Sequence, residues 1–231
     1  MARGEQEQIN ITELVSVVLG KARLYEALIQ GVQTLLWHRQ PVQSYEAQKL
    51  VKGVETETAV QRELRTWREK LHWDTDSNVV IPQDAIKKSI PEGSRKLQLK
   101  VGKTSLATIL EGALRPQGPM QILDAQMSRI PKDSALIEPF EAMVTIQRSK
   151  VLRVRPSIQP PWFGLFQVMV LDERISVDSL ARAIIAHGAY SGFGDYRKSY
   201  GSYQLVSIEQ KQITLQQEVK GESIALRRAV G

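Results

Sequence analysis

Residues 187–203, HGAYSGFGDYRKSYGSY, depart furthest from ordinary fold-building sequence, and they decide how the rest of the chain is interpreted. Four glycines, four tyrosines and a phenylalanine surround Arg197 and Lys198. Glycine lets a backbone approach a ligand closely, tyrosine offers a ring for stacking, and the two cations attract phosphate. The combination indicates nucleic acid. A long glycine-rich turn whose tyrosines are merely packed is the alternative that this stretch leaves open.

Regular elements flank the glycine-rich stretch on both sides. Residues 176–187, SVDSLARAIIAH, have apolar positions at helical spacing after a candidate N-cap, Ser176. Residues 140–146, 150–158, 162–171 and 202–208 have strand character, and alternation in 150–158 places Arg153 and Arg155 on one face. This order predicts an α+β fold: a ferredoxin-like (RRM-like) antiparallel sheet with helices on one face.

The earlier part of the chain is less regular. Residues 24–30 are ambiguous between helix and strand, and they lead to an aromatic residue, a histidine and a cation at Trp37, His38 and Arg39. Residues 44–71 are helical in character, 79–81 predict a short strand, and Pro82 opens a helix. Residues 93–118 predict a cationic loop. We expect one domain over 1–231, with a helical and basic-loop insertion at about 42–135.

Composition allows a polyanionic partner and excludes several kinds of chemistry. The chain has 231 residues, 42% of them hydrophobic, and a formal net charge of +6. It has no cysteine, which excludes disulfides and thiolate catalysis. GKTS at 102–105 lacks the earlier glycine of a phosphate loop, because Leu97 stands there, and no metal or dinucleotide motif is present. We therefore expect no cofactor and no metal. The absence of a long apolar run or signal pattern predicts a soluble, cytoplasmic protein without a membrane partner.

Three stretches resemble the RAMP superfamily, the ferredoxin-like or RRM-like proteins of CRISPR effector complexes with relatives in phages and prophages. Residues 192–205, GFGDYRKSYGSYQL, resemble the family's glycine-rich loop before a final strand. Residues 78–90, NVVIPQDAIKKSI, resemble its strand, proline and helix element, and 34–41, TLLWHRQP, its first-strand exit. The likeness is nearest to the backbone-subunit branch or a phage or prophage relative. Asp195 departs from it by placing a negative charge beside Arg197.

The resemblance implies a subunit that binds single-stranded RNA, or single-stranded DNA, in a ribonucleoprotein assembly for antiviral defence. Its partners would be copies of itself or other subunits. In this hypothesis the protein has no catalytic residue, basic side chains contact phosphates, glycines allow close approach and aromatic rings stack on bases. The expected nucleic-acid-binding residues are Trp37, Arg39, Lys88, Lys96, Lys103, Arg153, Arg155, Gly192, Gly194, Tyr196, Arg197, Lys198 and Tyr200.

Two other functions stay open at this point. The first is a metal-independent endoribonuclease of the crRNA-processing type, in which His38 or His187 acts as general base or acid. The second is a structural or assembly protein whose basic surface binds another protein.

Overall fold

An antiparallel sheet lies at the centre of the fold, which a computed structural model describes for residues 22–38, 57–197 and 199–212. Its strand order is β11-β1-β10-β7-β3, with β6 also pairing with β10. The strands are β1 (Arg23–Gly31), β3 (Val80–Ile81), β6 (Leu114–Pro116), β7 (Met120–Leu123), β10 (Phe163–Val170) and β11 (Tyr203–Lys211).

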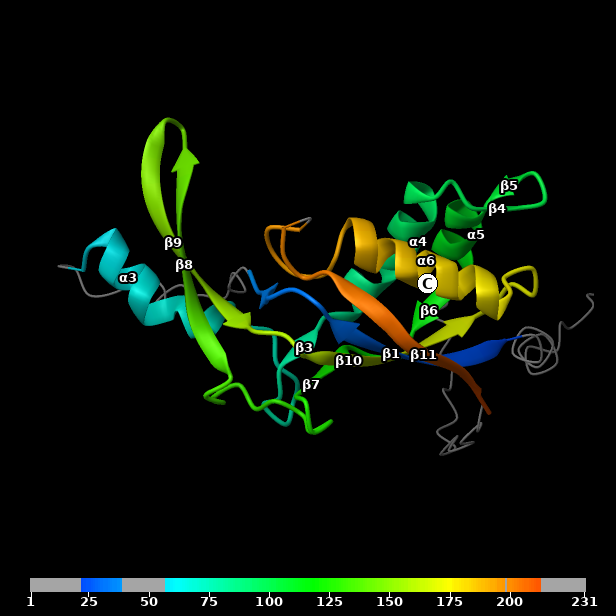
Figure 1. Ribbon diagram of the computed structural model, residues 1–231, viewed down its shortest axis with the longest axis horizontal. Coiled ribbons are helices and arrows are strands. Elements are labelled where there is room, and N and C mark those ends of the chain that lie inside the picture. The colour runs from blue at the N-terminus through cyan, green and yellow to red at the C-terminus, as the bar shows by residue number, and fades with distance from the viewer. Residues whose placement is uncertain (1–21, 39–56, 198, 213–231) are drawn as a thin grey trace, which may run out of the picture.

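Helices α4 (Gln83–Lys96), α5 (Leu106–Ala113) and α6 (Val177–Tyr190) lie over one face of this sheet (Figure 1). On β1 the side chains of Tyr25, Ala27 and Ile29 are buried in turn, as expected for a strand with one covered face. Along the chain the elements run β1, α4, β6 and β7, β10, α6, β11, with the last strand beside the first. The predicted α+β, ferredoxin-like class is confirmed.

A second sheet, β2-β9-β8, extends the molecule to one side. β8 (Ile137–Ile146) and β9 (Ser149–Ile158) form a long hairpin that projects from the body, and β2 (Leu35–Leu36) pairs with the end of β9 (Figure 1). Helix α3 (Ala59–Thr66), capped by Thr58, and the short helix η1 (Trp67–Lys70) pack against β9. The chain therefore passes from the main sheet to the second one directly after β1.

Local signals predicted most of these elements. α6 begins after Ser176, whose hydroxyl accepts from the Ser179 N–H at 3.1 Å, and α4 begins after Pro82. The ambiguous residues 24–30 belong to β1. Predicted elements within 39–56 lie outside the described residues. Among the described helices, none is long and apolar enough to cross a bilayer.

The predicted loop over 93–118 was wrong, because this range is mostly regular structure. α4 continues to Lys96, and a hairpin of β4 (Lys100–Val101) and β5 (Thr104–Ser105) leads into α5. The range expected as an insertion, about 42–135, contributes α4, β6 and β7 to the main sheet and its helical layer.

Close packing against α6 explains why α4 continues through Gly93. A Cβ there would lie 2.1 Å from the Ala183 carbonyl oxygen and 2.6 Å from the His187 nitrogen, both on α6. Only a residue without a side chain lets the two helices pack this closely.

We expect Gly93→Ala to destabilise the fold by about 1–3 kcal/mol, because the added methyl group overlaps the α6 backbone. Gly112→Ala in α5 is the matched control. A Cβ there has no neighbour within 4 Å, so alanine should stabilise the helix by about 0.5–1 kcal/mol. Urea unfolding of both variants measures the difference, and effects of the same sign would contradict the packing.

Candidate nucleic-acid interface

The glycine-rich loop docks on the protein's own backbone. The Asp195 N–H donates to the Leu36 carbonyl at 2.9 Å, and the Gly201 N–H donates to the Thr34 carbonyl at 2.8 Å. Gly194 has a φ of 86°, and a Cβ on it would lie 2.2 Å from the Leu36 oxygen. Gly192, with a φ of 71°, is similarly crowded by Gly201. These glycines therefore permit close packing within the chain, and a role of Gly192 and Gly194 in ligand approach stays a prediction.

The docked loop brings together three side chains that are far apart in the sequence, which we call the loop cluster: His38, Arg155 and Asp195. Arg155 on β9 is only 5% exposed, and its Nε donates to Asp195 Oδ2 at 2.7 Å. Its Nη2 lies 3.1 Å from His38 Nδ1. Asp195 Oδ2 lies farther from this nitrogen, at 3.4 Å. Because arginine only donates, we assign His38 Nδ1 as the acceptor and the proton of the neutral ring to Nε2.

Positive charge surrounds His38. Desolvation lowers the pKa of His38, the Arg155 guanidinium lowers it further, and Asp195 opposes the shift. A neutral ring with Nε2–H is therefore the form of His38 at neutral pH. In this form Nε2 donates a hydrogen bond and does not act as a general base.

The two β9 arginines share a face, as predicted, but each is paired with an acid. Arg153 donates to Glu63 Oε1 at 2.8 Å, and Lys70 bonds to the other oxygen of the same carboxylate. Desolvation lowers the pKa of Lys70, against the effect of Glu63. The charges of Arg153 and Arg155 are therefore largely balanced by acids within the protein, and these ion pairs stabilise the second sheet and the loop.

The predicted aromatic residues separate into core and surface. Trp37 is 1% exposed, and its Nε1 donates to the Val80 carbonyl at 3.3 Å, so this ring belongs to the core and does not stack on bases. Tyr196 and Tyr200 are partly exposed, with ring centroids 6.4 Å apart. Tyr200 also meets Phe140 of β8 edge-on at 5.2 Å. Both tyrosines keep a position suited to stacking.

Of the predicted residues Arg39, Arg197 and Lys198, the structure describes only Arg197. It is about half exposed and pairs with Glu92 at 3.0 Å. Arg39 and Lys198 lie outside the described residues.

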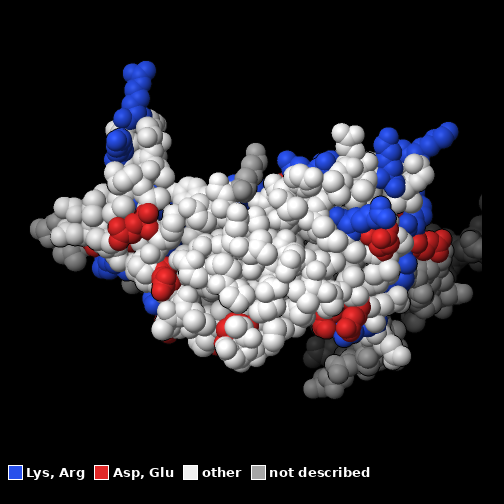
Figure 2. All heavy atoms as spheres, in the orientation of Figure 1, with Lys and Arg blue, Asp and Glu red and all other residues white. Residues whose placement is uncertain are grey.

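Lys88, Lys96 and Lys103 lie on a surface that we call the lysine ridge, which also includes Lys87 and Lys100. All five are exposed, on α4 and the β4–β5 hairpin. Figure 2 shows Lys and Arg gathered over this region and again at the tip of the β8–β9 hairpin. Within the described residues, no acidic group forms an ion pair with any of the five lysines. The ridge is thus the least neutralised positive surface among the predicted residues.

A hollow of about 270 Å³ adjoins the loop cluster. His38 and Asp195 line one part of it, and Pro82 and Ala85, at the start of α4, line another. His72 lies on the same hollow, a residue that no sequence motif distinguishes. Among the described residues, no group of three His, Asp or Glu side chains is placed to hold a metal ion. The remaining lining residues are Trp37, Ile81 and Gly194.

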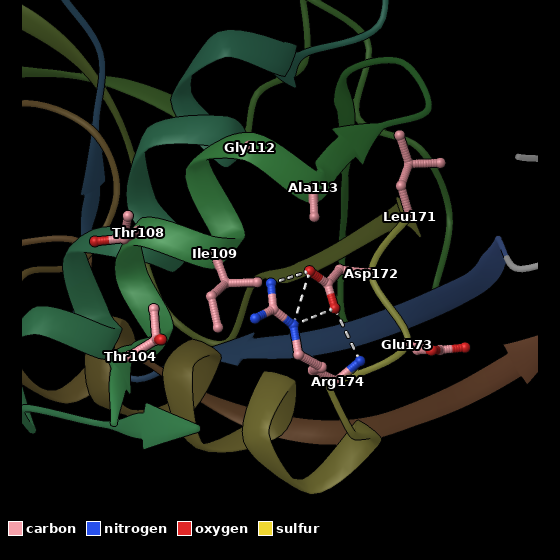
Figure 3. Close-up of a pocket in the computed structure, with 9 residues that line it drawn as sticks. All are labelled: Thr104, Thr108, Ile109, Gly112, Ala113, Leu171, Asp172, Glu173 and Arg174. Atoms are coloured by element: carbon pink, nitrogen blue, oxygen red, sulfur yellow. Dashed lines mark hydrogen bonds and ion pairs between the residues drawn. The ribbon is translucent and has the colours of Figure 1, made fainter. Parts of the chain in front are cut away.

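A larger hollow, of about 570 Å³, lies between α5 and the segment that joins β10 to α6 (Figure 3). Two of its charged residues, Asp172 and Arg174, are engaged with each other. Arg174 holds the pKa of Asp172 to about 2 through their hydrogen bonds, the shortest at 2.6 Å. None of the predicted binding residues lines it, so it is not the interface proposed below.

His187 is structural, which removes it as a catalytic candidate. Its side chain is fully buried, and Nδ1 lies 2.9 Å from the Tyr203 hydroxyl. The ring packs 4.9 Å from that of Phe193. A substrate would have no access to it.

No protein-family model matches the sequence, and no curated protein matches it. The fold is similar to solved structures at low identity. One is a chain in the cryo-EM structure of the Type III-B Cmr-beta bound to cognate target RNA, with a TM-score of 0.45, 15% identity, and coverage of 90% of this chain and 68% of that one. Another is Csc2 of Thermofilum pendens, with a TM-score of 0.28, 11% identity, and coverage of 84% and 68%. The function is therefore argued from this chain's own residues.

His187 makes a pH-dependent contribution to stability. Burial lowers its pKa from 6.5 to about 4, so in this interval the unfolded chain binds a proton that the folded one does not. Stability should therefore fall as pH decreases from about 6.5 to about 4, by up to about 3 kcal/mol from this group. Urea unfolding across the interval measures the loss. His187→Phe should lose less over the same interval, and an unchanged pH dependence would contradict the assignment.

Proposed function

We propose that this protein is a RAMP-like subunit that binds single-stranded nucleic acid, RNA by preference, within a CRISPR-type or phage ribonucleoprotein assembly. The observation that supports this most is the lysine ridge, a group of exposed cations without described acidic partners. The proposal includes one domain over 1–231, a cytoplasmic location, and copies of itself or other subunits as partners.

The lysines of the ridge and the ion-paired arginines differ in how readily their charges can bind a polyanion. A lysine without a partner neutralises a phosphate and releases a counterion from the nucleic acid. Arg153 and Arg197 must first weaken their contacts with Glu63 and Glu92. The ridge should therefore supply most of the salt-dependent affinity.

Tyr196 and Tyr200 are the proposed stacking rings. The Arg155 guanidinium lies 6.0 Å from the Tyr196 ring centroid, a cation–π contact that helps to fix its position. Stacking of a base on such a ring contributes about 1–3 kcal/mol and tolerates different sequences.

The open face of the main sheet is a poorer surface for nucleic acid. On the uncovered side of β1 and β11, Glu26 and Glu209 oppose each other, with Lys211 between them. Two carboxylates repel phosphate, unlike the basic and aromatic sheet face that many RNA-binding domains use. We therefore place the interface on the loop and ridge side.

Binding should depend on the ridge. We expect Lys88→Ala, Lys96→Ala and Lys103→Ala together to weaken binding of a mixed-sequence single-stranded RNA about tenfold at low salt. The slope of log K against log salt should fall by about 2, since each phosphate contact on a single strand contributes about 0.7. Fluorescence anisotropy in EDTA across a salt series measures both quantities, and single-stranded DNA of the same sequence tests the preference for RNA.

The matched control removes three charges elsewhere. Arg174 and Arg182 are exposed and Lys211 is partly exposed, but each is paired with an acid, so their triple alanine variant should retain most of the affinity. RNA recovered after binding should be uncleaved. Wild-type protein that binds no RNA at low salt would refute the proposal, and cleavage in EDTA that His38→Ala abolishes would favour the endoribonuclease.

A further inference from the structure

Another hollow, of about 360 Å³, lies between α4 and α5 on the lysine ridge. We propose that it binds the phosphomonoester and the ribose of a single ribonucleotide. The ligand is a free mononucleotide or the phosphorylated end of an RNA strand, which present the same chemistry, and only the second source rests on the proposed function. The residues that line the hollow are Asp84, Lys87, Lys88, Pro91, Arg95 and Glu111.

The hollow follows α4 from its first turn to its last. Asp84 lies in the first turn and Arg95 in the last, about 16 Å apart along the axis at a rise of about 1.5 Å per residue. Arg95 forms an ion pair with Glu111 of α5, which joins the two helices at that end. The volume of about 360 Å³ is within the roughly 300–1,000 Å³ of small-molecule sites, so the hollow admits a nucleotide and not only an inorganic anion.

The free positive charge in the hollow matches a phosphomonoester. Arg95 and Glu111 balance each other, which leaves the ammonium groups of Lys87 and Lys88. Neither lysine forms an ion pair within the described residues. A phosphomonoester carries a charge of about −1.5 to −2 at neutral pH, whereas a phosphodiester inside a strand carries a single negative charge. Two lysines that face one hollow therefore suit a terminal phosphate better than an internal one.

Hydrogen-bond acceptors beside these lysines indicate a ribose. Asp84 forms no ion pair within the part of the chain that the structure describes, and a phosphate dianion has no hydrogen to donate to its carboxylate. Pro91 has no N–H, so the Lys87 carbonyl, one turn earlier, lacks its usual helical donor. A ribose 2′-hydroxyl can donate to either acceptor, as it does to the acidic residue of dinucleotide-binding folds.

The place of the hollow on the ridge also suits the end of a strand. Lys96 is the last residue of α4, and Lys100 and Lys103 follow on the β4–β5 hairpin. A strand whose terminal nucleotide occupies the hollow can continue along these exposed lysines, which neutralise its internal phosphates. The ridge then binds the backbone, and the hollow recognises where the backbone ends.

The test compares ligands with and without the phosphomonoester. In isothermal titration calorimetry we expect adenosine 5′-phosphate or 3′-phosphate to bind about tenfold more tightly than adenosine, and several-fold more tightly than the matching 2′-deoxynucleotide. In fluorescence anisotropy, RNA with a 5′- or a 3′-phosphate should bind about tenfold more tightly than the same RNA without it. A gain only for the mononucleotide identifies a free nucleotide as the ligand, and a gain only for the RNA identifies the strand end.

Variants of exposed residues locate the gain. Lys87→Ala should remove most of it, whereas Lys103→Ala removes a ridge lysine outside the hollow and should weaken all the RNAs alike. Asp84→Asn should retain the phosphate gain and remove the preference for ribose. Asp178→Asn is its matched control, because Asp178 is also an exposed aspartate in the first turn of a helix of 14 residues, and it should change neither quantity.

Three outcomes would overturn the inference. These are no gain from the phosphomonoester in either ligand, a gain that persists in Lys87→Ala, and displacement of the mononucleotide by inorganic phosphate at equal concentration. The proposed function stands in each case if RNA binds with the expected dependence on the ridge. If the wild-type protein binds no RNA at low salt but binds the mononucleotide, the proposed function fails and the inference stands.

Discussion

The contact between the glycine-rich loop and the segment after β1 determines the geometry of the site. Two backbone hydrogen bonds, to the carbonyls of Leu36 and Thr34, hold the loop against this segment. Gly194 makes the approach possible, because any Cβ there would overlap the Leu36 oxygen. Asp195 is the next residue, so its backbone position is fixed as well. Its carboxylate accepts a hydrogen bond from Arg155 on β9. The pairing of β2 with β9 places His38 beside the second sheet, and this contact adds the loop to that arrangement.

The positive charge of the protein is of two kinds. The arginines near the loop are paired with Asp195, Glu63 and Glu92, and their charges are largely balanced within the protein. The lysines of the ridge are exposed and are screened by salt over a distance of about 8–10 Å. Long-range attraction of a polyanion should therefore come from the ridge, while the arginines hold the shape of the loop cluster. This division means that net charge alone does not locate the proposed interface.

Local sequence patterns predicted the elements well where the signal was also local. Ser176 and Pro82 mark the starts of α6 and α4, and alternation revealed β9. β1 was ambiguous because its strand character depends on pairing with β10 and β11, more than a hundred residues away. The loop predicted over 93–118 failed for a similar reason, since Gly93 is tolerated in α4 only because α6 packs on it.

The site was less predictable, because its chemistry depends on partners distant in sequence. Arg153 looks like a phosphate ligand until Glu63, from α3, is found beside it. Trp37 precedes a histidine and an arginine, yet its ring is enclosed by the core. A glycine that approaches a ligand and one that approaches its own chain have the same requirement, the absence of a Cβ, so the sequence does not distinguish them.

A carboxylate such as that of Asp195 is unexpected in a phosphate-binding loop. Its contact with Arg155 explains why it is there. Arg155 is almost fully buried, and a buried guanidinium without a carboxylate would be strongly destabilising, by several kcal/mol. Asp195 compensates that charge, and the pair in turn fixes the tautomer of His38. A negative charge in the loop of a basic protein for which we propose nucleic-acid binding is then no contradiction. It lets an arginine stay inside the fold, and through that arginine it holds the loop, β9 and His38 in one arrangement.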